Sequence, residues 1–256
     1  MVEAKFQMSK KTRTRLKLVL LTAFILLFEY GFTVGYCNEL NKVLWFDFAL
    51  NFSDESVILI LDQRVGHIDQ SGRITIEPQF KGIGSFSNGL APIRIKGLWG
   101  FIDHASETVI KPEFEGVGRF RKGMARIRMK GRWGYIDKTG QMVIKPQFNQ
   151  AKAFSQDLAC IGMGKGADLK YGYIDKTGQI VIKPQFNQAK AFSQDLACIG
   201  MGEYPDTQYG YIDRKNRIVI PPQFDHGHNF SEGFALVKLE GRWGAVDVNG
   251  NFLRQP

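Results

Sequence analysis

The chain has 256 residues, of which 44% are hydrophobic and 23% charged, and its formal net charge is +9 at pH 7. These proportions are ordinary for a globular protein and argue against a disordered chain. The 28 glycines indicate many tight turns between short strands, whereas three cysteines are too few for a disulfide scaffold and lack metal-ligand spacing.

The first 37 residues differ from the rest. Six basic residues between Lys5 and Lys17 precede an apolar run of 11 residues, Leu18 to Phe28. This is the layout of an export signal, and the run is shorter than the ~20 residues that span a bilayer. We predict that residues 1–37 are a signal peptide or, if retained, a membrane anchor. The remainder is then extracytoplasmic: secreted, periplasmic, or anchored and facing outward.

The charge divides unevenly between these two parts. The six basic residues and two acidic residues of the leader leave it at +4, so +5 belongs to the rest. A mildly basic chain is attracted weakly to acidic polymers or membrane surfaces, but it is far from a nucleic-acid-binding stripe. We predict no nucleic-acid partner and membrane contact only through the N-terminal segment.

The rest of the chain repeats itself. The segment GYIDKTGQMVIKPQFNQAKAFSQDLACIGMG from Gly134 recurs from Gly172 with only Met142 changed, to Ile180. Looser copies surround these two, each marked by an aromatic-glycine pair. The first residues of these pairs, including a degenerate valine, are Val65, Trp99, Trp133, Tyr171, Tyr209 and Trp243.

Each unit carries the same markers in the same order. An aspartate and a turn come first, then a β-branched run ending in proline, then phenylalanines six residues apart, then an alternating stretch such as Ala125 to Met129. The frame extends back to Phe46 and Phe52, and the end of the chain, Gly250 to Pro256, matches the start of another unit. We therefore predict one domain, residues 45–256, of about six units in a permuted frame.

The pattern predicts β-structure. Alternation with a period of two places one face of a strand on a core, and the recurring prolines and glycines are unfavourable in helices. We predict an all-β fold of tandem three-stranded antiparallel β-meanders, for example Trp133 to Asp137, Gln141 to Lys145 and Leu158 to Met163. Neighbouring units stack to bury their apolar faces in an open, solenoid-like array. The alternative is a closed, six-bladed, propeller-like ring.

These markers together resemble the WG-repeat family, also called KWG, a bacterial β-repeat. The resemblance covers about residues 45–256, although Val65, Tyr171 and Tyr209 replace the tryptophan. It implies a binding module of surface or envelope proteins. No common catalytic residue belongs to the family, so the resemblance implies none here.

Reactive groups are few. Six aspartates recur one per unit and are expected to cap turns, because a calcium site needs six or more converging oxygens. They are Asp69, Asp103, Asp137, Asp175, Asp213 and Asp247. His226 and His228 alternate like metal ligands but have no third ligand nearby. We predict no metal, no cofactor and no catalytic residue. Cys160 and Cys198 occupy equivalent strand positions, either as free thiols or as a disulfide across adjacent units.

Two surfaces are candidates for binding. The two long units contain extra loops whose flanks are nearly identical but whose sequences differ, as recognition loops do. Their candidate residues are Lys165, Asp168, Lys170, Glu203, Tyr204 and Asp206. A basic face is the second candidate, either as a binding patch or as an ordinary solvated sheet face. It comprises Arg94, Arg126, Arg128 and Lys238.

Together these features predict a non-enzymatic extracytoplasmic repeat module that binds a protein or a cell-envelope polymer. A unique active site gains nothing from near-identical duplication, whereas a binding surface gains area and avidity. The alternative is a structural spacer of the envelope without a specific ligand. The sequence identifies neither the ligand nor the oligomeric state.

Overall fold

The computed structural model describes residues 48–53, 56–61, 63–69 and 73–254, which lie in the second of the chain's two units, Trp45–Pro256. The predicted leader, residues 1–37, lies outside the described residues. Within the described ranges no helix is long and apolar enough to cross a membrane.

The described residues form strands and one short 3-10 helix. In chain order the elements are β1 (Phe48–Ser53), β2 (Ser56–Leu61), β3 (Arg64–Asp69), β4 (Ile74–Phe80), β5 (Ala91–Ile95), β6 (Leu98–Ile102), β7 (Thr108–Phe114), β8 (Gly116–Val117), β9 (Met124–Met129), β10 (Arg132–Asp137), β11 (Met142–Phe148), β12 (Gln150–Ala151), β13 (Ala159–Met163), η1 (Gly166–Asp168), β14 (Lys170–Ile174), β15 (Ile180–Phe186), β16 (Gln188–Ala189), β17 (Leu196–Met201), β18 (Gln208–Asp213), β19 (Ile218–Phe224), β20 (His226–Gly227), β21 (Phe234–Leu239), β22 (Arg242–Asp247) and β23 (Phe252–Arg254).

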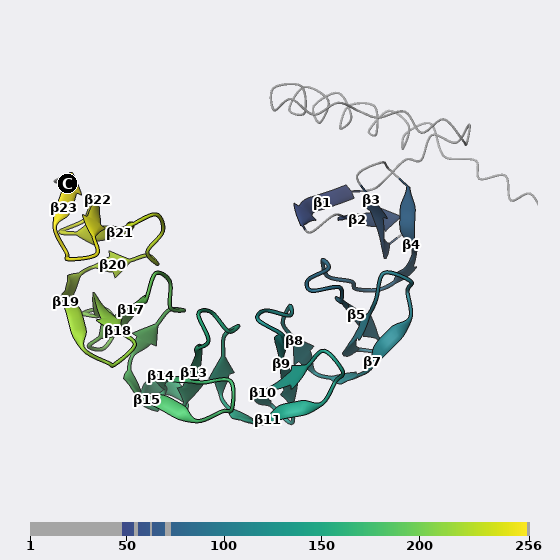
Figure 1. Cartoon of the computed structure of the whole chain (residues 1–256), viewed down its shortest axis with the longest axis horizontal. Helices are drawn as coiled ribbons and strands as arrows, with labels where there is room; N and C mark the ends of the chain where they lie inside the picture. Colours follow the sequence, from purple (N-terminus) through teal and green to yellow (C-terminus); the bar gives the residue numbers. More distant parts are fainter. Residues whose placement is uncertain (1–47, 54–55, 62, 70–72, 255–256) are drawn as a thin grey trace, which may run out of the picture. The chain divides into compact units, whose positions relative to one another are not determined.

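Six antiparallel sheets follow one another in chain order (Figure 1). They are sheet 1 (β1–β4), sheet 2 (β5–β7), sheet 3 (β8–β11), sheet 4 (β12–β15), sheet 5 (β16–β19) and sheet 6 (β20–β23). None of the buried clusters among the described residues joins sheet 1 to sheet 6, although such clusters join neighbouring sheets. The prediction of an all-β, open, tandem array is confirmed, and the closed ring is not formed.

The frame of the unit differs from the predicted one. We expected Leu158 to Met163 to close the meander that begins at Trp133, but β13 pairs with β14 and therefore opens the next sheet. In sheets 3 to 6 a two-residue strand precedes it, such as β12, which pairs with β13. The predicted three strands are thus present, and most sheets add a short fourth strand at one edge. The long connection that holds Phe154 lies within the next sheet, between its short strand β12 and β13.

The glycine after each aromatic residue has a steric reason. Beside Gly134 the register between β10 and β11 shifts, and β11 bulges towards the glycine. A Cβ on Gly134 would lie 2.4 Å from the carbonyl oxygen of Ile144 and 2.6 Å from the nitrogen of Pro146. The same close approach recurs at Gly100, Gly172 and Gly210. The aromatic-glycine pair therefore lies on the strand that pairs with the bulged strand, here β10 opposite β11.

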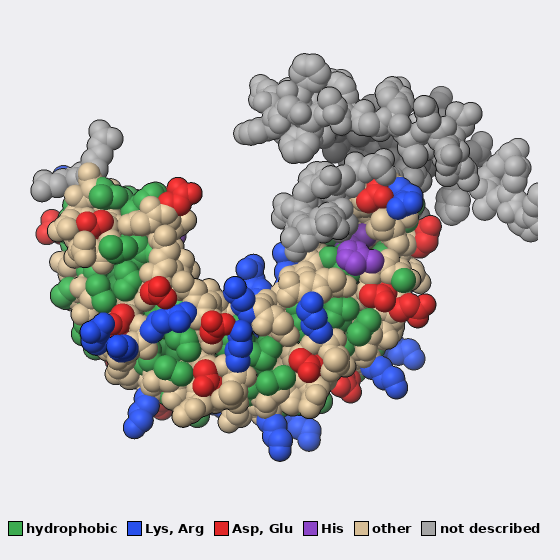
Figure 2. Space-filling view, in the orientation of Figure 1, with side chains coloured by type: hydrophobic (Ala, Val, Ile, Leu, Met, Phe, Trp, Pro, Cys, Tyr) green, Lys and Arg blue, Asp and Glu red, His purple; other side chains and the backbone are tan. Residues whose placement is uncertain are grey.

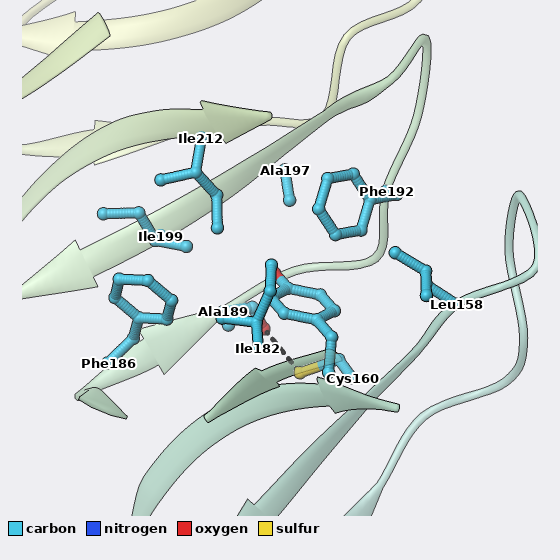
Figure 3. Close-up of a cluster of buried hydrophobic side chains, with 10 residues drawn as sticks. Leu158, Cys160, Ile182, Phe186, Ala189, Phe192, Ala197, Ile199 and Ile212 are labelled. Carbon is cyan, nitrogen blue, oxygen red and sulfur yellow. Dashed lines mark hydrogen bonds between the residues drawn. The ribbon is translucent and has the colours of Figure 1, made fainter. Parts of the chain in front are cut away.

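Neighbouring sheets share a core. Between sheets 4 and 5, Tyr173, Ile182 and Phe186 of one sheet pack on Phe192 and Ile199 of the next (Figure 3). The interfaces between the other neighbouring sheets repeat this arrangement with equivalent residues. Each inner sheet thus uses both faces, and a single sheet has no core of its own.

Candidate binding site

A ladder of hydrogen bonds connects loops that precede β5, β9, β13, β17 and β21. We call them the Phe loops, because each is centred on a buried phenylalanine: Phe86, Phe120, Phe154, Phe192 and Phe230. The serine after the phenylalanine donates to the carbonyl of the phenylalanine in the next loop. The bonds run from Ser87 to Phe120 at 2.7 Å, from Ser155 to Phe192 at 2.8 Å and from Ser193 to Phe230 at 2.7 Å.

One Phe loop departs from this pattern. In sheet 3 the residue after the phenylalanine is Arg121, and among the described residues no side chain donates to the carbonyl of Phe154. The flanking residues, Arg119 and Lys122, are also basic, whereas the next loop has Ala153, Ser155 and Gln156 in these positions. The break in the ladder and the three cations therefore occur in the same loop.

A pocket of about 480 Å³ opens where the ladder is broken. Its lining comes from three consecutive Phe loops and comprises Ser87, Asn88, Arg119, Phe120, Arg121, Lys122, Phe154 and Ser155. Figure 2 shows Lys and Arg side chains beside the loop that leads into β9. The lining is thus polar, with three cations and no carboxylate.

The charges around this pocket are mostly uncompensated. Among the described residues Arg119, Arg121 and Lys122 form no ion pair. The adjacent Asp157 bonds Lys176 at 2.7 Å. That hydrogen bond, and to a lesser degree the charge of Lys122, lowers the pKa of Asp157 below its usual value.

Arg119 is held in place from the preceding loop. Its guanidinium donates to the hydroxyl of the buried Ser85 at 3.0 Å. One of the five guanidinium donors is thus used inside the protein, and the others remain for a ligand. Because carboxylates and phosphates accept from a guanidinium in a planar fork, the arrangement suits an oxyanion.

The predicted extra loops lie at the other ends of the strands. They join β13 to β14 and β17 to β18, where the shorter units have two-residue turns such as Lys130-Gly131, both with positive φ. Lys165, Asp168, Glu203, Tyr204 and Asp206 are exposed, and Lys170 is half-buried. The Phe loops instead meet the strand ends at Asp137, which pairs with Met124. The pocket and the extra loops are therefore separate surfaces.

The predicted basic face has structural contacts. Arg126 stacks on the ring of Trp133 at 4.8 Å and donates to the carbonyl of Ala151 in the next sheet. The remaining three lie on equivalent strands: Arg94 over Trp99 at 5.8 Å, Arg128 exposed and 3.8 Å from Glu115, and Lys238 half-buried and paired with Trp243. Arg94 and Arg126 thus cover tryptophan rings of their own sheets, and binding by this face stays a prediction.

The aspartates cap turns, as predicted. Oδ1 of Asp137 accepts from the backbone N–H groups of Thr139 and Gln141, both at 2.9 Å. The hydroxyl of Thr139 bonds the same oxygen and is the largest cause of the lowered pKa of Asp137. Equivalent caps form at Asp103, Asp175, Asp213 and Asp247.

The histidines take part in ring contacts. The rings of His226 and His228 lie 5.0 Å apart, and both rings contact Trp243. In the part of the chain that the structure describes, no three His, Cys, Asp or Glu side chains are grouped to hold a metal ion.

The two cysteines of the duplicated units are buried free thiols. Cys160 donates to the carbonyl of Ala189 in the next sheet at 3.6 Å (Figure 3), and Cys198 donates to Gly227 at 3.5 Å. Burial raises the pKa of Cys160 to about 12 and that of Cys198 to about 11. Each thiol therefore stays protonated at neutral pH and faces the next sheet rather than the other cysteine.

Sequence reasoning missed the pocket. The signal was present, because Arg119-Phe120-Arg121-Lys122 stands where the neighbouring units read Ser-Phe-Ser-Asn and Ala-Phe-Ser-Gln. The prediction relied on positions that the units share, and this loop differs from the others. A comparison of the units for positions where one of them differs would have identified it.

Comparisons with known proteins agree with the repeat architecture. No curated protein matches the chain. In fold it is similar to two β-propeller-like structures. One is a eukaryotic initiation factor, at 10% identity and a TM-score of 0.50 over 88% of this chain and 79% of that one. The other is Hsv2 of Kluyveromyces lactis, at 9% identity and a TM-score of 0.51 over 76% and 71%. At these identities the likeness concerns the fold alone.

The sequence profile described as "WG containing repeat" matches five consecutive stretches of the chain, residues 66–99, 99–133, 133–165, 171–204 and 209–243. These stretches contain the aromatic-glycine pairs that begin at Trp99, Trp133, Tyr171 and Tyr209, and all five Phe loops described above. The chain therefore belongs to the WG-containing repeat family.

Proposed function

We propose that this protein is a non-enzymatic, extracytoplasmic module that binds a protein or an envelope polymer, and that the pocket between the Phe loops of sheets 2, 3 and 4 is its principal site. The observation that carries the proposal is the basic loop of sheet 3. On a scaffold otherwise repeated closely, this loop replaces the ladder serine by Arg121 and adds Arg119 and Lys122. Local rules of a fold are broken most often at functional sites.

The chemistry of the site supports binding rather than catalysis. The pocket is lined by arginine, lysine, serine, asparagine and phenylalanine, so it offers donors and charge but no histidine or carboxylate as a general base. The thiols of Cys160 and Cys198 are buried and protonated, which makes them poor nucleophiles. His67 is buried in sheet 1 and serves packing.

The extra loops remain a second candidate surface. They are exposed, they differ in sequence, and one includes Tyr204, which is 94% exposed. An aromatic side chain so exposed is a frequent anchor in protein interfaces. The extra loops thus favour a protein partner, and the pocket favours a charged ligand.

The extracytoplasmic location rests on the leader. A basic stretch followed by 11 apolar residues is typical of an export signal. Fusing residues 1–60 to a reporter that is active only outside the cytoplasm tests this part directly. Reporter activity is the expected result, and an inactive, stably expressed fusion would contradict it.

Capture experiments with the full chain test the function. Solubilised envelope and wall fractions are passed over the immobilised protein, over a pocket variant (Arg119→Ala, Arg121→Ser, Lys122→Gln) and over a short-loop variant. In the short-loop variant the dipeptide Lys-Gly replaces Gly164 to Leu169 and Gly202 to Thr207, because Met163 pairs with Lys170 and Met201 with Gln208. Lys-Gly is the turn that the chain itself uses between Met129 and Arg132.

The outcome shows which of the two surfaces binds the captured component. Capture lost only in the pocket variant places the function at the pocket, and capture lost only in the short-loop variant places it at the extra loops. If none of the three folded proteins captures any component, the binding proposal is wrong and the structural spacer is the better description.

A further inference from the structure

The pocket has a composition that no other Phe loop shares. At the three positions around the phenylalanine, four loops read Ser-Ser-Asn, Ala-Ser-Gln, Ala-Ser-Gln and Asn-Ser-Glu, and the loop of sheet 3 reads Arg-Arg-Lys. All five loops surround a buried phenylalanine, and each occupies the equivalent position in its own repeat. Since the backbone context is shared, the three cations are not needed to form the loop.

The cations weaken the loop that carries them. Arg121 gives up the serine bond to the next loop, which stabilises the other steps of the ladder. Three like charges line one pocket, and no carboxylate lines it with them. Like charges that line one pocket repel each other, and a bound anion relieves this repulsion.

The turn that follows β10 adds a further positive charge near this pocket. In sheets 4 and 5 the turn cations Lys176 and Arg214 are paired with Asp157 and Asp195 of the Phe loops. In sheet 3 the corresponding loop residue is Gly123, and Lys138 forms no ion pair among the described residues. A fourth cation therefore stands near this loop without the carboxylate that its counterparts have.

From these observations we infer that the pocket binds the oxyanions of an anionic polymer, with Arg119, Arg121 and Lys122 as the ligand-binding cations. The inference rests on the proposed binding function and names its ligand class. Arg119, fixed by Ser85, presents its remaining donors, and the side-chain amide of Asn88 supplies a neutral donor.

The size and exposure of the site favour a polymer over a single small ion. A volume of about 480 Å³ exceeds what one phosphate or carboxylate group fills. Arg119, Arg121 and Lys122 are exposed, so water and salt weaken each contact. Several linked anionic groups overcome this weakness, because each further contact is made within one complex.

Direct binding measurements with defined polymers test the inference. Fluorescently labelled polyphosphate and labelled oligogalacturonate represent phosphate and carboxylate as the source of the oxyanion, neutral dextran is the control polymer, and inorganic phosphate is the single ion. The full chain is titrated into each by fluorescence anisotropy, and inorganic phosphate is added as a competitor. We expect saturable binding of at least one of the two polyanions, none of dextran, and displacement by inorganic phosphate only at a large excess.

Two matched variants separate the pocket from net charge. The pocket variant, Arg119→Ala with Arg121→Ser and Lys122→Gln, installs residues that the same scaffold already carries at Ala153, Ser155 and Gln156. It should fold with an unchanged or higher unfolding midpoint. The charge control, Lys111→Gln with Lys145→Gln and Lys183→Gln, removes the same three charges from exposed positions on β7, β11 and β15.

We expect the pocket variant to lose at least tenfold in affinity for the bound polyanion and the charge control to lose less than threefold. Equal losses in the two variants, or undiminished binding by a folded pocket variant, would overturn the inference. If the pocket variant also keeps its capture of envelope material, the binding function stands and only the ligand assignment fails. If the native chain binds neither polyanion and captures nothing, both fail.

Discussion

Buried polar atoms hold successive sheets at fixed positions. The hydroxyls of Tyr135, Tyr173 and Tyr211 donate to carbonyls of the next sheet at 2.7–2.8 Å. All three side chains are fully buried, and burial raises the pKa of each phenol far above its usual value. Because a buried donor must find a partner, each tyrosine allows only one alignment of its sheet on the next.

Replacing one of these tyrosines tests this role. Tyr173→Phe removes the hydroxyl and leaves the carbonyl of Lys190 without that donor, so the free energy of unfolding should fall by about 1 kcal/mol. Tyr171→Phe is the matched control, since Tyr171 lies on the same strand, is half-buried and makes no side-chain hydrogen bond among the described residues. Urea denaturation measures both. Equal midpoints for the two variants would contradict the assignment.

His67 occupies the position of these tyrosines in sheet 1. Its side chain is fully buried against the ring of Phe86, and burial, the largest cause, lowers its pKa to about 4. A base with a lowered folded-state pKa stabilises the fold above its unfolded pKa of about 6.5. That contribution is lost as the pH falls from about 6.5 towards 4, because the unfolded chain takes up the proton first.

His67→Phe should remove this pH dependence. Sheet 2 has Phe101 at the same position, packed 4.9 Å from Phe120 as His67 packs 5.0 Å from Phe86. Thermal unfolding between pH 7 and pH 4 should show the native protein losing more stability than the variant. Parallel losses in the two proteins would show that another group titrates.

The strands obey a steric rule that the sequence displays as the aromatic-glycine pair. The bulged partner strand brings a carbonyl and a proline nitrogen against Gly134. Any side chain there would move the partner strand, and the bulge sets the register of β10 with β11. The pair therefore recurs because the glycine is needed for the bulge, while the aromatic residue varies between tryptophan and tyrosine.

Gly134→Ala should therefore be costly. Its Cβ would lie within 2.4 Å of the Ile144 carbonyl, and we expect the unfolding free energy to fall by about 2 kcal/mol or more. Gly116→Ala in the same sheet is the control, because its Cβ would make an ordinary contact of 3.4 Å with Trp133. Chemical denaturation of both variants decides the point, and a tolerated Gly134→Ala would disprove the steric account.

The elements that were predicted correctly are those with a repeated local signal. Alternation predicted β9 and its counterparts, and Asp137 with Gly140 predicted the turn that follows β10. The two-residue strands such as β12 were missed because two residues show no period. The frame was wrong because repetition in the sequence gives the length of a unit but not the point at which one sheet ends, and the hairpin of β13 with β14 places that point after β11.

The whole array is built from interfaces between neighbouring sheets, and these interfaces use equivalent residues. Sheet 3 packs Tyr135 and Phe148 on Phe154 of sheet 4, and sheet 4 packs the equivalent Tyr173 and Phe186 on Phe192 of sheet 5. The two receiving faces are identical in sequence at Ala151, Phe154, Ala159, Ile161 and Ile174 and at Ala189, Phe192, Ala197, Ile199 and Ile212. Stability in such an array is close to a sum of neighbour contacts.

The array should therefore survive the loss of one sheet. Deleting Gln150 to Asn187 joins Asn149 to Gln188, preserves the local sequence Phe-Asn-Gln-Ala-Lys and places sheet 3 on sheet 5 through an unchanged set of side chains. We expect cooperative urea unfolding with a denaturant dependence lower by roughly one sixth, since less surface is exposed. The polyanion affinity should persist, because Phe192 and Ser193 replace Phe154 and Ser155 in the lining of the pocket.

A deletion out of register is the control for this shortening. Removing Gln150 to Gln194 takes away seven residues more and joins Asn149 to Asp195, so the short strand β16 and the Phe loop with Phe192 are lost and β17 follows β11 directly. It should fail to fold, as judged by circular dichroism and the absence of a cooperative transition. If the in-register deletion also fails, the sheets depend on contacts beyond their neighbours. If it folds and loses the polyanion, sheet 4 supplies something to the pocket that its near-identical successor does not.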